Sequence, residues 1–334
     1  MVDRRFILLM LCLSTAGFAQ TPSVAPASGT SPTTRGTWQL GDGGWARVNN
    51  LPAGGPTLAL DPALREIQSV MARRDYSASR KQLIDWLRAN PTSPQRDVAL
   101  MMMARTLNAR GERMRAFYYC DELLDTCADS PLYSQALQFQ YEIADNYLKG
   151  TRDRFWGMRL IDRKDDGVEM LFRIQQRSPG SPVSEKALLR TADHYWTSGD
   201  FDLAADAYDA FGNSFPRSPF ANEVKLQEAR ANLAQYNGPR FDATPLINAR
   251  EQLVQIGTQD PLFARQNDIE ALISESERQL ARKLVISADF YKRTGKPDVR
   301  KHLLNRLVRE FPGTPEAQNA RAELGLTPSP NPQP

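Results

Sequence analysis

The sequence is poor in the residues from which most catalytic and metal sites are built. Its 334 residues contain two histidines and three cysteines. His194 and His302 lie far apart in helical segments, and no spacing of cysteine and histidine suits zinc. The chain also has no glycine-rich phosphate loop, no Gly-x-Ser-x-Gly and no His-Glu-x-x-His motif. We therefore expect neither an enzyme nor a bound metal or cofactor.

An excess of charge of one sign is lacking as well. Lysine and arginine total 42, aspartate and glutamate 39, and the net charge is +3. This balance argues against the broad basic surface with which proteins bind nucleic acid. We expect protein partners and no nucleic acid, and any charge-driven contact must use a local patch. Apolar residues make up 41% of the chain, enough for a sizeable core.

Apolar runs long enough to span a bilayer are also missing. A spanning helix needs about 18 or more apolar residues, and the run from Phe6 to Leu13 is shorter. It follows two arginines and precedes small residues, so residues 1–19 predict a signal peptide cleaved before Gln20. The protein is then exported, to the periplasm or the periplasmic face of the outer membrane. Two alternatives are an uncleaved anchor and a lipid on Cys12, although a lipidated cysteine normally follows a small residue and Cys12 follows leucine.

Three further segments lie outside the predicted repeat domain. Residues 20–35 are rich in Pro, Ser, Thr and Gly and predict a flexible linker. Residues 327–334 alternate proline with polar residues and predict a disordered tail. Residues 36–60 contain two short alternating arms around a glycine-rich turn, which predict a hairpin-like segment. Its residues Trp38 and Trp45 either pack on the first helices or form a flap that faces a partner.

From residue 61 to residue 326 the pattern becomes helical and repeats. Pro94 and Pro131 are 37 residues apart, and so are Pro182 and Pro219. Each unit can be counted from a turn residue, with a small residue five positions later, a large one nine positions later, and prolines at seventeen and twenty. This template fits, in places loosely, from five turn residues: Arg74, Gly111, Asp162, Gly199 and Gly295. A fixed period of this length is typical of a solenoid of helix pairs.

The offsets have a physical basis. A turn glycine accepts positive φ and ends the first helix, and the small residue lets the two helices approach closely. The large residue, one turn further along the same face, fills the space between them, and the prolines end the second helix and begin the next. Each pair exposes an apolar face that only its neighbour can cover. The predicted fold is all-α, with helix-turn-helix repeats stacked into a right-handed superhelix.

A family resemblance extends this interpretation. Ala192 to Phe201, followed by Ala204, Tyr208 and Pro216, resembles the tetratricopeptide consensus. Over residues 61–326 the arrangement resembles the BamD family of outer membrane protein assembly factors, most clearly at residues 129–131, 199–205 and 288–315. The resemblance implies a cell-envelope scaffold that binds proteins of the outer-membrane assembly machinery. Alternatives are a soluble periplasmic tetratricopeptide adaptor for envelope or division complexes, and an enzyme or its regulatory subunit.

The sequence departs from this pattern at an insertion of fourteen residues, Lys149 to Asp162. It brings together arginines and aromatic residues, which are the composition of interface anchors. We predict a partner-binding or membrane-surface contact made by Arg152, Arg154, Phe155, Trp156 and Arg159. The alternative is that the two aromatic residues fill a gap between helix pairs.

Two further expectations concern helices. Cys120 and Cys127 are seven residues apart, so about 10 Å separates them along a helix, whereas a disulfide needs Cα atoms within about 7 Å. We expect free thiols, unless the helix end frays to allow a bridge. Thr244 and Pro245 predict a helix start with a threonine cap, and residues 262–294 predict one long helix.

Overall fold

The computed structural model describes residues 37–41, 44–48, 59–151, 153–155, 158–161 and 163–326. The predicted signal peptide, linker and tail, with Cys12, lie outside these residues. Within them the chain forms fourteen helices and two antiparallel two-stranded sheets. The predicted hairpin is one of these sheets, in which β1 (Thr37–Gly41) pairs with β2 (Gly44–Val48).

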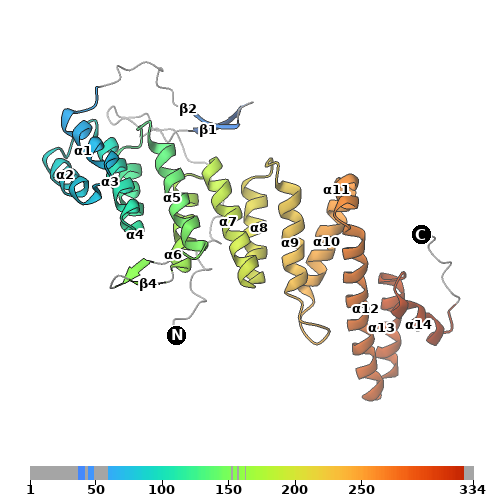
Figure 1. Cartoon of the computed structure of the whole chain (residues 1–334). Helices are drawn as coiled ribbons and strands as arrows, with labels where there is room; N and C mark the ends of the chain where they lie inside the picture. Colours follow the sequence, from blue (N-terminus) through green and yellow to red (C-terminus); the bar gives the residue numbers. More distant parts are fainter. Residues whose placement is uncertain are drawn as a thin grey trace, which may run out of the picture. The chain divides into compact units, whose positions relative to one another are not determined.

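The helices follow one another from residue 62 to residue 323 (Figure 1). Their bounds are α1 Pro62–Ala72, α2 Tyr76–Ala89, α3 Arg96–Ala109, α4 Arg113–Thr126, α5 Tyr133–Leu148, α6 Lys164–Arg177, α7 Pro182–Ser198, α8 Phe201–Ser214, α9 Ala221–Ala234, α10 Thr244–Gln259, α11 Pro261–Gln266, α12 Ile269–Arg293, α13 Pro297–Glu310 and α14 Pro315–Glu323. Among them, none has both the length and the apolar character needed to cross a membrane.

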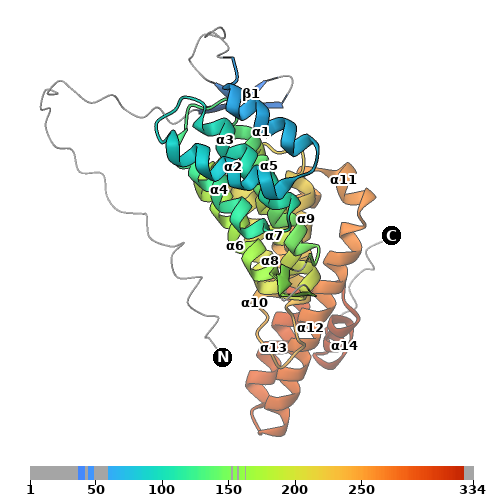
Figure 2. The same cartoon turned by 60° about the vertical axis from the view of Figure 1, so that its left-hand side comes forward.

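The helices of the described chain pack as six successive pairs: α1–α2, α3–α4, α5–α6, α7–α8, α9–α10 and α12–α13. The second helix of a pair also contacts the first helix of the pair that follows, as α4 contacts α5 and α8 contacts α9. Figures 1 and 2 show this succession from two directions. The predicted all-α, tetratricopeptide-like fold is confirmed.

The turn residues of the template adopt the predicted backbone conformation. Gly111, Gly199 and Gly295 have φ values of +83°, +81° and +71°, and Arg74 takes the same left-handed conformation at +63°. Gly199 is the C-cap of α7. Glycine adopts this conformation without a steric penalty, so three of these four turns are unstrained and the turn at Arg74 is not.

The small residues of the template lie where helices approach closely. Ala116 and Ala204 are completely buried. A Cβ atom added to Gly167 would lie 3.0 Å from the carbonyl oxygen of Ala144 and 3.1 Å from Cβ of Tyr147. The predicted close contact therefore occurs between α5 and α6, and glycine is what permits it.

The insertion contains a turn glycine of its own. Gly150, two residues beyond α5, has a φ of +88°. The chain then forms β3 (Asp153–Phe155) and β4 (Met158–Ile161), which pair antiparallel before α6 begins. The left-handed turn of this pair is thus at Gly150, while Asp162, from which the template was counted, lies outside the described residues.

Three details of the helices differ from the sequence predictions. The pair α9–α10 was not among the five predicted units, and residues 235–243 join its helices with Gly238 at φ +111°. The helix expected over residues 262–294 is broken between α11 and α12, where Asp268 has a φ of +52°. The cap of α10 is Ala243, and Thr244 is the first residue of the helix.

The core consists of four clusters of buried apolar residues, each built from helices that are neighbours in the sequence. The first extends from Leu64 in α1 to Ala187 in α7. The second joins α7, α8 and α9, the third joins α9, α10 and the start of α12, and the last joins α12, α13 and α14 with residues at the start of α10. The template's large residues Leu83, Cys120, Leu171, Tyr208 and Leu304 are all buried. Cys120 and Cys127 are free thiols, as expected.

Candidate protein-binding surface

The structure gives a backbone to three of the five residues predicted to bind a partner. Arg154 and Phe155 lie in β3 and Arg159 in β4, while Arg152 and Trp156 lie outside the described residues. The strand register places Arg154 opposite Arg159.

The helix that leads into the insertion ends in a network of charged groups. Asp145 of α5 accepts a hydrogen bond from Nε of Arg190 in α7 at 2.6 Å, and Nζ of Lys149 lies 2.6 Å from its other oxygen. Burial alone would raise the pKa of Asp145, but the hydrogen bonds from Lys149 and Arg190 hold it below its usual value. The start of the insertion is therefore held next to the helix pair α7–α8.

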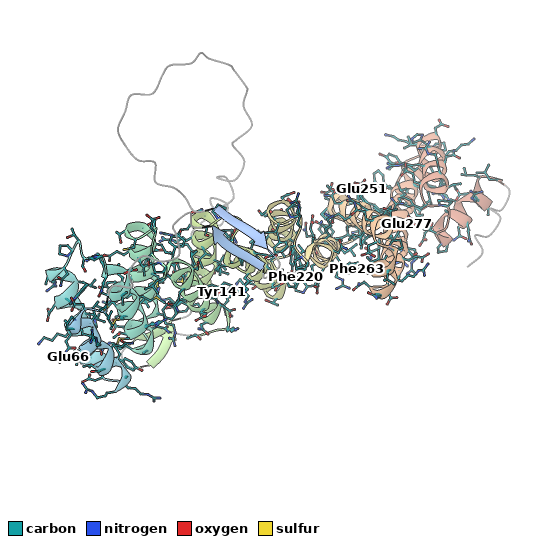
Figure 3. All side chains as sticks on the ribbon, turned by 90° about the horizontal axis from the view of Figure 1, so that it is seen from above. Glu66, Tyr141, Phe220, Glu251, Phe263 and Glu277 are labelled. Carbon is teal, nitrogen blue, oxygen red and sulfur yellow. The ribbon has the colours of Figure 1, made fainter. Side chains whose placement is uncertain are left out.

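Two aromatic residues lie near this ion pair, one on α5 and one on α7, the first helices of two successive pairs. Tyr141 lies one turn before Asp145 (Figure 3), and burial together with the charge of Asp145 raises its pKa. On α7, burial and the nearby Arg190 lower the pKa of His194, which favours the neutral imidazole. We call Tyr141, Asp145, Arg190, Asp193 and His194 the α5–α7 face.

Asp193 connects the α5–α7 face to α8. Asp193 accepts a hydrogen bond of 2.8 Å from the hydroxyl of Tyr208 in α8. Burial and this hydrogen bond both raise the pKa of Tyr208 far above its usual value. Tyr208 is the large residue of the repeat template, so its polar end supports the α5–α7 face while its ring fills the core.

The α5–α7 face combines aromatic rings, charged groups and hydrogen-bonding groups. In the described part of the chain no group of three or more histidine, cysteine or acidic side chains could hold a metal ion. Half-buried aromatic rings beside a charged pair provide apolar area together with directional hydrogen bonds, the composition of protein interfaces. Asp145 and Arg190 are 45 residues apart, so only the stacking of the helix pairs shows that they meet.

A second set of charged and polar residues lies on α4, α5 and α6, and its members pair with one another. Arg177 binds Asp121 at 3.2 Å, and the side-chain amide of Gln140 donates to the same carboxylate at 2.7 Å. The guanidinium of Arg173 lies 5.8 Å from the ring centroid of Tyr118. Because these charges are neutralised by their neighbours, this set stabilises the stacking of helices.

Exposed apolar side chains concentrate in the second half of the described chain. Tyr118 precedes residue 200, and the other large exposed ones follow it, including Phe220 at the turn before α9 (Figure 3). They are Phe220, Phe241, Ile247, Val254, Leu262, Ile286, Phe290, Val299 and Leu326. Apolar side chains that are exposed singly are ordinary on a protein surface, so they indicate a binding site only where several of them lie together.

Several solved structures resemble the chain at low similarity. The C-terminal part of a TPR repeat-containing protein from Cytophaga hutchinsonii is 11% identical, with a TM-score of 0.33, and the match covers 77% of this chain and 86% of that one. PilF from Pseudomonas aeruginosa is 13% identical, with a TM-score of 0.29 and coverages of 78% and 96%. A thermophilic TPR protein from Thermus thermophilus is 19% identical, with a TM-score of 0.28 and coverages of 64% and 96%. Values this low carry no argument about function.

The family comparison is more specific. No curated protein sequence matches the chain. The model of the YfiO family, described as outer membrane lipoprotein, matches residues 164–325, from the first residue of α6 to two residues beyond the end of α14. This range contains the template units at Gly199 and Gly295 as well as the pair α9–α10. The chain is a tetratricopeptide-like helical-repeat protein, and its residues 164–325 match the YfiO, or BamD, family of outer membrane lipoproteins.

Proposed function

We propose that the protein is a non-catalytic scaffold of the cell envelope that binds partner proteins of the outer-membrane assembly machinery. The observation that carries this proposal is the family match over residues 164–325. The fold supports it, because stacked helix pairs present extended surfaces without a catalytic centre.

The proposed location is the periplasmic face of the outer membrane. It rests on the predicted signal peptide, residues 1–19, and on the family's description as outer membrane lipoproteins. The linker of residues 20–35 would let the repeats act at a short distance from the membrane, because a flexible chain of this length extends about 20 Å on average. Mass spectrometry of the mature N-terminus separates two forms: Gln20 indicates a cleaved soluble product, and a diacylated Cys12 indicates a lipid anchor.

The proposed partner contact is the insertion together with the α5–α7 face. Lys149, the residue after α5, is ion-paired to Asp145 of this face. At the other end of the insertion, Lys164 is close enough to His194 to lower its pKa. Both ends of the insertion therefore border the α5–α7 face. The three arginines of the insertion, Arg152, Arg154 and Arg159, favour an acidic partner segment.

The contact is tested by recovering partners from envelope extracts with the full chain and with the double variant Phe155→Ser/Trp156→Ser. We expect weaker recovery with unchanged helicity, and unchanged recovery for Phe220→Ser, an exposed aromatic residue distant in the sequence. Lower thermal stability with normal recovery would mean that the two aromatic residues fill a gap between helix pairs.

The role itself is tested by depleting the protein and quantifying β-barrel proteins in the outer membrane. We expect their levels to fall. Unchanged barrel levels in cells that export the protein normally would favour the alternative, a soluble adaptor for other envelope complexes.

A further inference from the structure

Positive charge is concentrated where α12 and α13 meet. Residues 286–301, which we call the α12–α13 tip, contain five lysines and arginines against two aspartates. This local excess equals the net charge of the whole chain, +3. The tip is thus the local patch that an otherwise balanced composition requires for any charge-driven contact.

One of these five charges is neutralised within the protein. Arg300 binds Asp289 of α12 at 2.6 Å and Glu323 of α14 at 2.7 Å, and so ties three helices together. The other four are exposed and form no ion pair with a carboxylate of the described chain: Lys292, Arg293, Lys296 and Lys301.

Helix stability accounts for only two of the four unpaired charges. Lys292 and Arg293 lie in the last turn of α12, where a cation favours the helix dipole. Lys296, however, is the N-cap of α13, a position that favours Ser, Thr, Asp or Asn. Lys301 follows in the second turn, near the positive end of the dipole. These two charges oppose the local electrostatics of α13, so the fold does not explain them.

Exposed apolar side chains accompany the charges. Ile286 and Phe290 are four residues apart and therefore lie on one face of α12, and Val299 lies in the first turn of α13. The ion pair between Arg300 and Asp289 brings Val299 and Phe290 to the same level of the two helices. The tip therefore combines apolar side chains with cations.

The last helix leaves this end of the pair uncovered. α14 has nine residues, about 14 Å, whereas α12 has 25 residues, about 37 Å. Its first turn binds Arg282 through Glu316, and its last residue, Glu323, binds Arg300. The helix ends there, and Phe290 and the four unpaired cations remain exposed.

We infer that the α12–α13 tip contacts the anionic headgroups of a phospholipid surface. Apolar side chains that insert at the headgroup boundary, beside lysines and arginines that bind phosphate, are the pattern of interfacial membrane contacts. The cations are spread over a helix end, a turn and the next helix start, so a planar anionic surface reaches more of them than one acidic segment does. The family of outer membrane lipoproteins puts such a surface within reach.

The test is co-sedimentation of the purified full chain with phospholipid vesicles. The vesicles contain either phosphatidylcholine alone or phosphatidylcholine mixed with phosphatidylglycerol. The tip variant is Lys292→Glu/Arg293→Glu. Its matched control, Lys81→Glu/Arg88→Glu, also reverses one lysine and one arginine, both exposed on α2.

We expect binding to the anionic vesicles that weakens with added salt and little binding to the neutral ones. Each basic residue near an anionic surface contributes roughly a factor of five to binding. The tip variant loses two of these contributions and gains two repelled carboxylates, so it should bind at least about 25-fold more weakly, and the control variant should bind as the unmodified chain does.

The apolar part of the inference has its own pair of variants. Phe290→Ser should weaken vesicle binding, whereas Phe220→Ser should not, although the two rings are similarly exposed, at 52% and 47%. Neither variant removes a buried side chain, so circular dichroism should show unchanged helicity for both.

Two results would overturn the inference. Failure of the unmodified chain to bind the anionic vesicles would do so, and so would equal binding by the tip variant and its control. If the tip variant instead no longer recovered an envelope protein from extracts but still bound the vesicles, the tip would be a site of protein contact. The two vesicle results do not depend on the proposed assembly role, because the vesicle experiment contains no other protein.

Discussion

The close approach of α5 and α6 at Gly167 predicts that replacing this glycine by alanine lowers the stability of the protein, whereas the same substitution in an open helix raises it. In an open helix, replacing glycine by alanine stabilises the helix by about 1 kcal/mol. At Gly167 the added Cβ would lie 3.0 Å from a backbone oxygen of α5, which cannot move without shifting that helix. Overpacking of this kind costs about 1–3 kcal/mol. We therefore expect Gly167→Ala to destabilise the protein by about 1 kcal/mol, the difference between the two effects.

Gly212 in α8 provides the matched control. A Cβ added there meets nothing within 4 Å, so Gly212→Ala should show the helix effect alone and stabilise the protein by up to about 1 kcal/mol. The difference between the two variants then isolates the cost of the close approach, about 1–3 kcal/mol.

Both variants are compared by urea unfolding followed by circular dichroism. Repeat proteins need not unfold in a single step. For each variant we therefore compare the urea midpoint of the unfolding transition that the substitution affects. The midpoint should fall for Gly167→Ala and rise for Gly212→Ala. A rise of equal size in both would show that α5 and α6 are not in close contact, and the template's requirement for a small residue would be wrong at this pair.

Three further predictions concern other helix pairs. Arg74→Gly should increase the free energy of unfolding by about 0.5–1 kcal/mol and so raise the urea midpoint, because the left-handed conformation at this position costs arginine more than glycine. Glu228 has a pKa raised to about 7 by burial and by the charge of Asp209, so stability should fall by about 1–2 kcal/mol, discounted for solvent screening, as pH rises from about 5 to 7.5. Cys120, whose pKa burial raises to about 12, should resist maleimide until the chain unfolds, whereas Cys127 should react.

The sign of the pH effect follows from linkage. The folded protein holds the proton of Glu228 more tightly than the unfolded chain does, so the favourable contribution is complete below the unfolded pKa and is lost as pH rises through the folded one. Glu228→Gln should remove the decline, and Glu223→Gln, an exposed position on the same helix, should keep it. A decline that persists in Glu228→Gln would show that another group causes it.

Rapid maleimide labelling of Cys120 in the folded protein would contradict its burial.

Much of the fold could be predicted because its determinants are local. The turn glycines, the small residue five positions later and the closing prolines all lie within one helix pair, and the buried positions Ala204 and Tyr208 follow from them. The pair α9–α10 was missed because residues 235–243 replace the short glycine turn with a longer connection. The break at Asp268 was missed because the apolar periodicity continues across it.

The candidate surfaces were less predictable, since they depend on contacts between repeats. The insertion could be recognised by its composition, but its strands are too short to give an alternating pattern. The pairing of Asp145 with Arg190 joins two repeats and leaves no local signal. The charge of the α12–α13 tip is visible in the sequence, whereas the short α14 that leaves it uncovered is understood only from the packing of the last three helices.

The division of the core into clusters of neighbouring helices has a consequence for the proposed export of the chain. A chain that crosses a membrane emerges in an unfolded state, N-terminus first. The cluster from α1 to α7 needs no residue beyond Tyr195, so it can form while the C-terminal helices are still in transit. Contacts between neighbours also close only short loops, which favours rapid folding. The order of emergence then becomes the order of assembly, and the helices of the α12–α13 tip are the last to find their places.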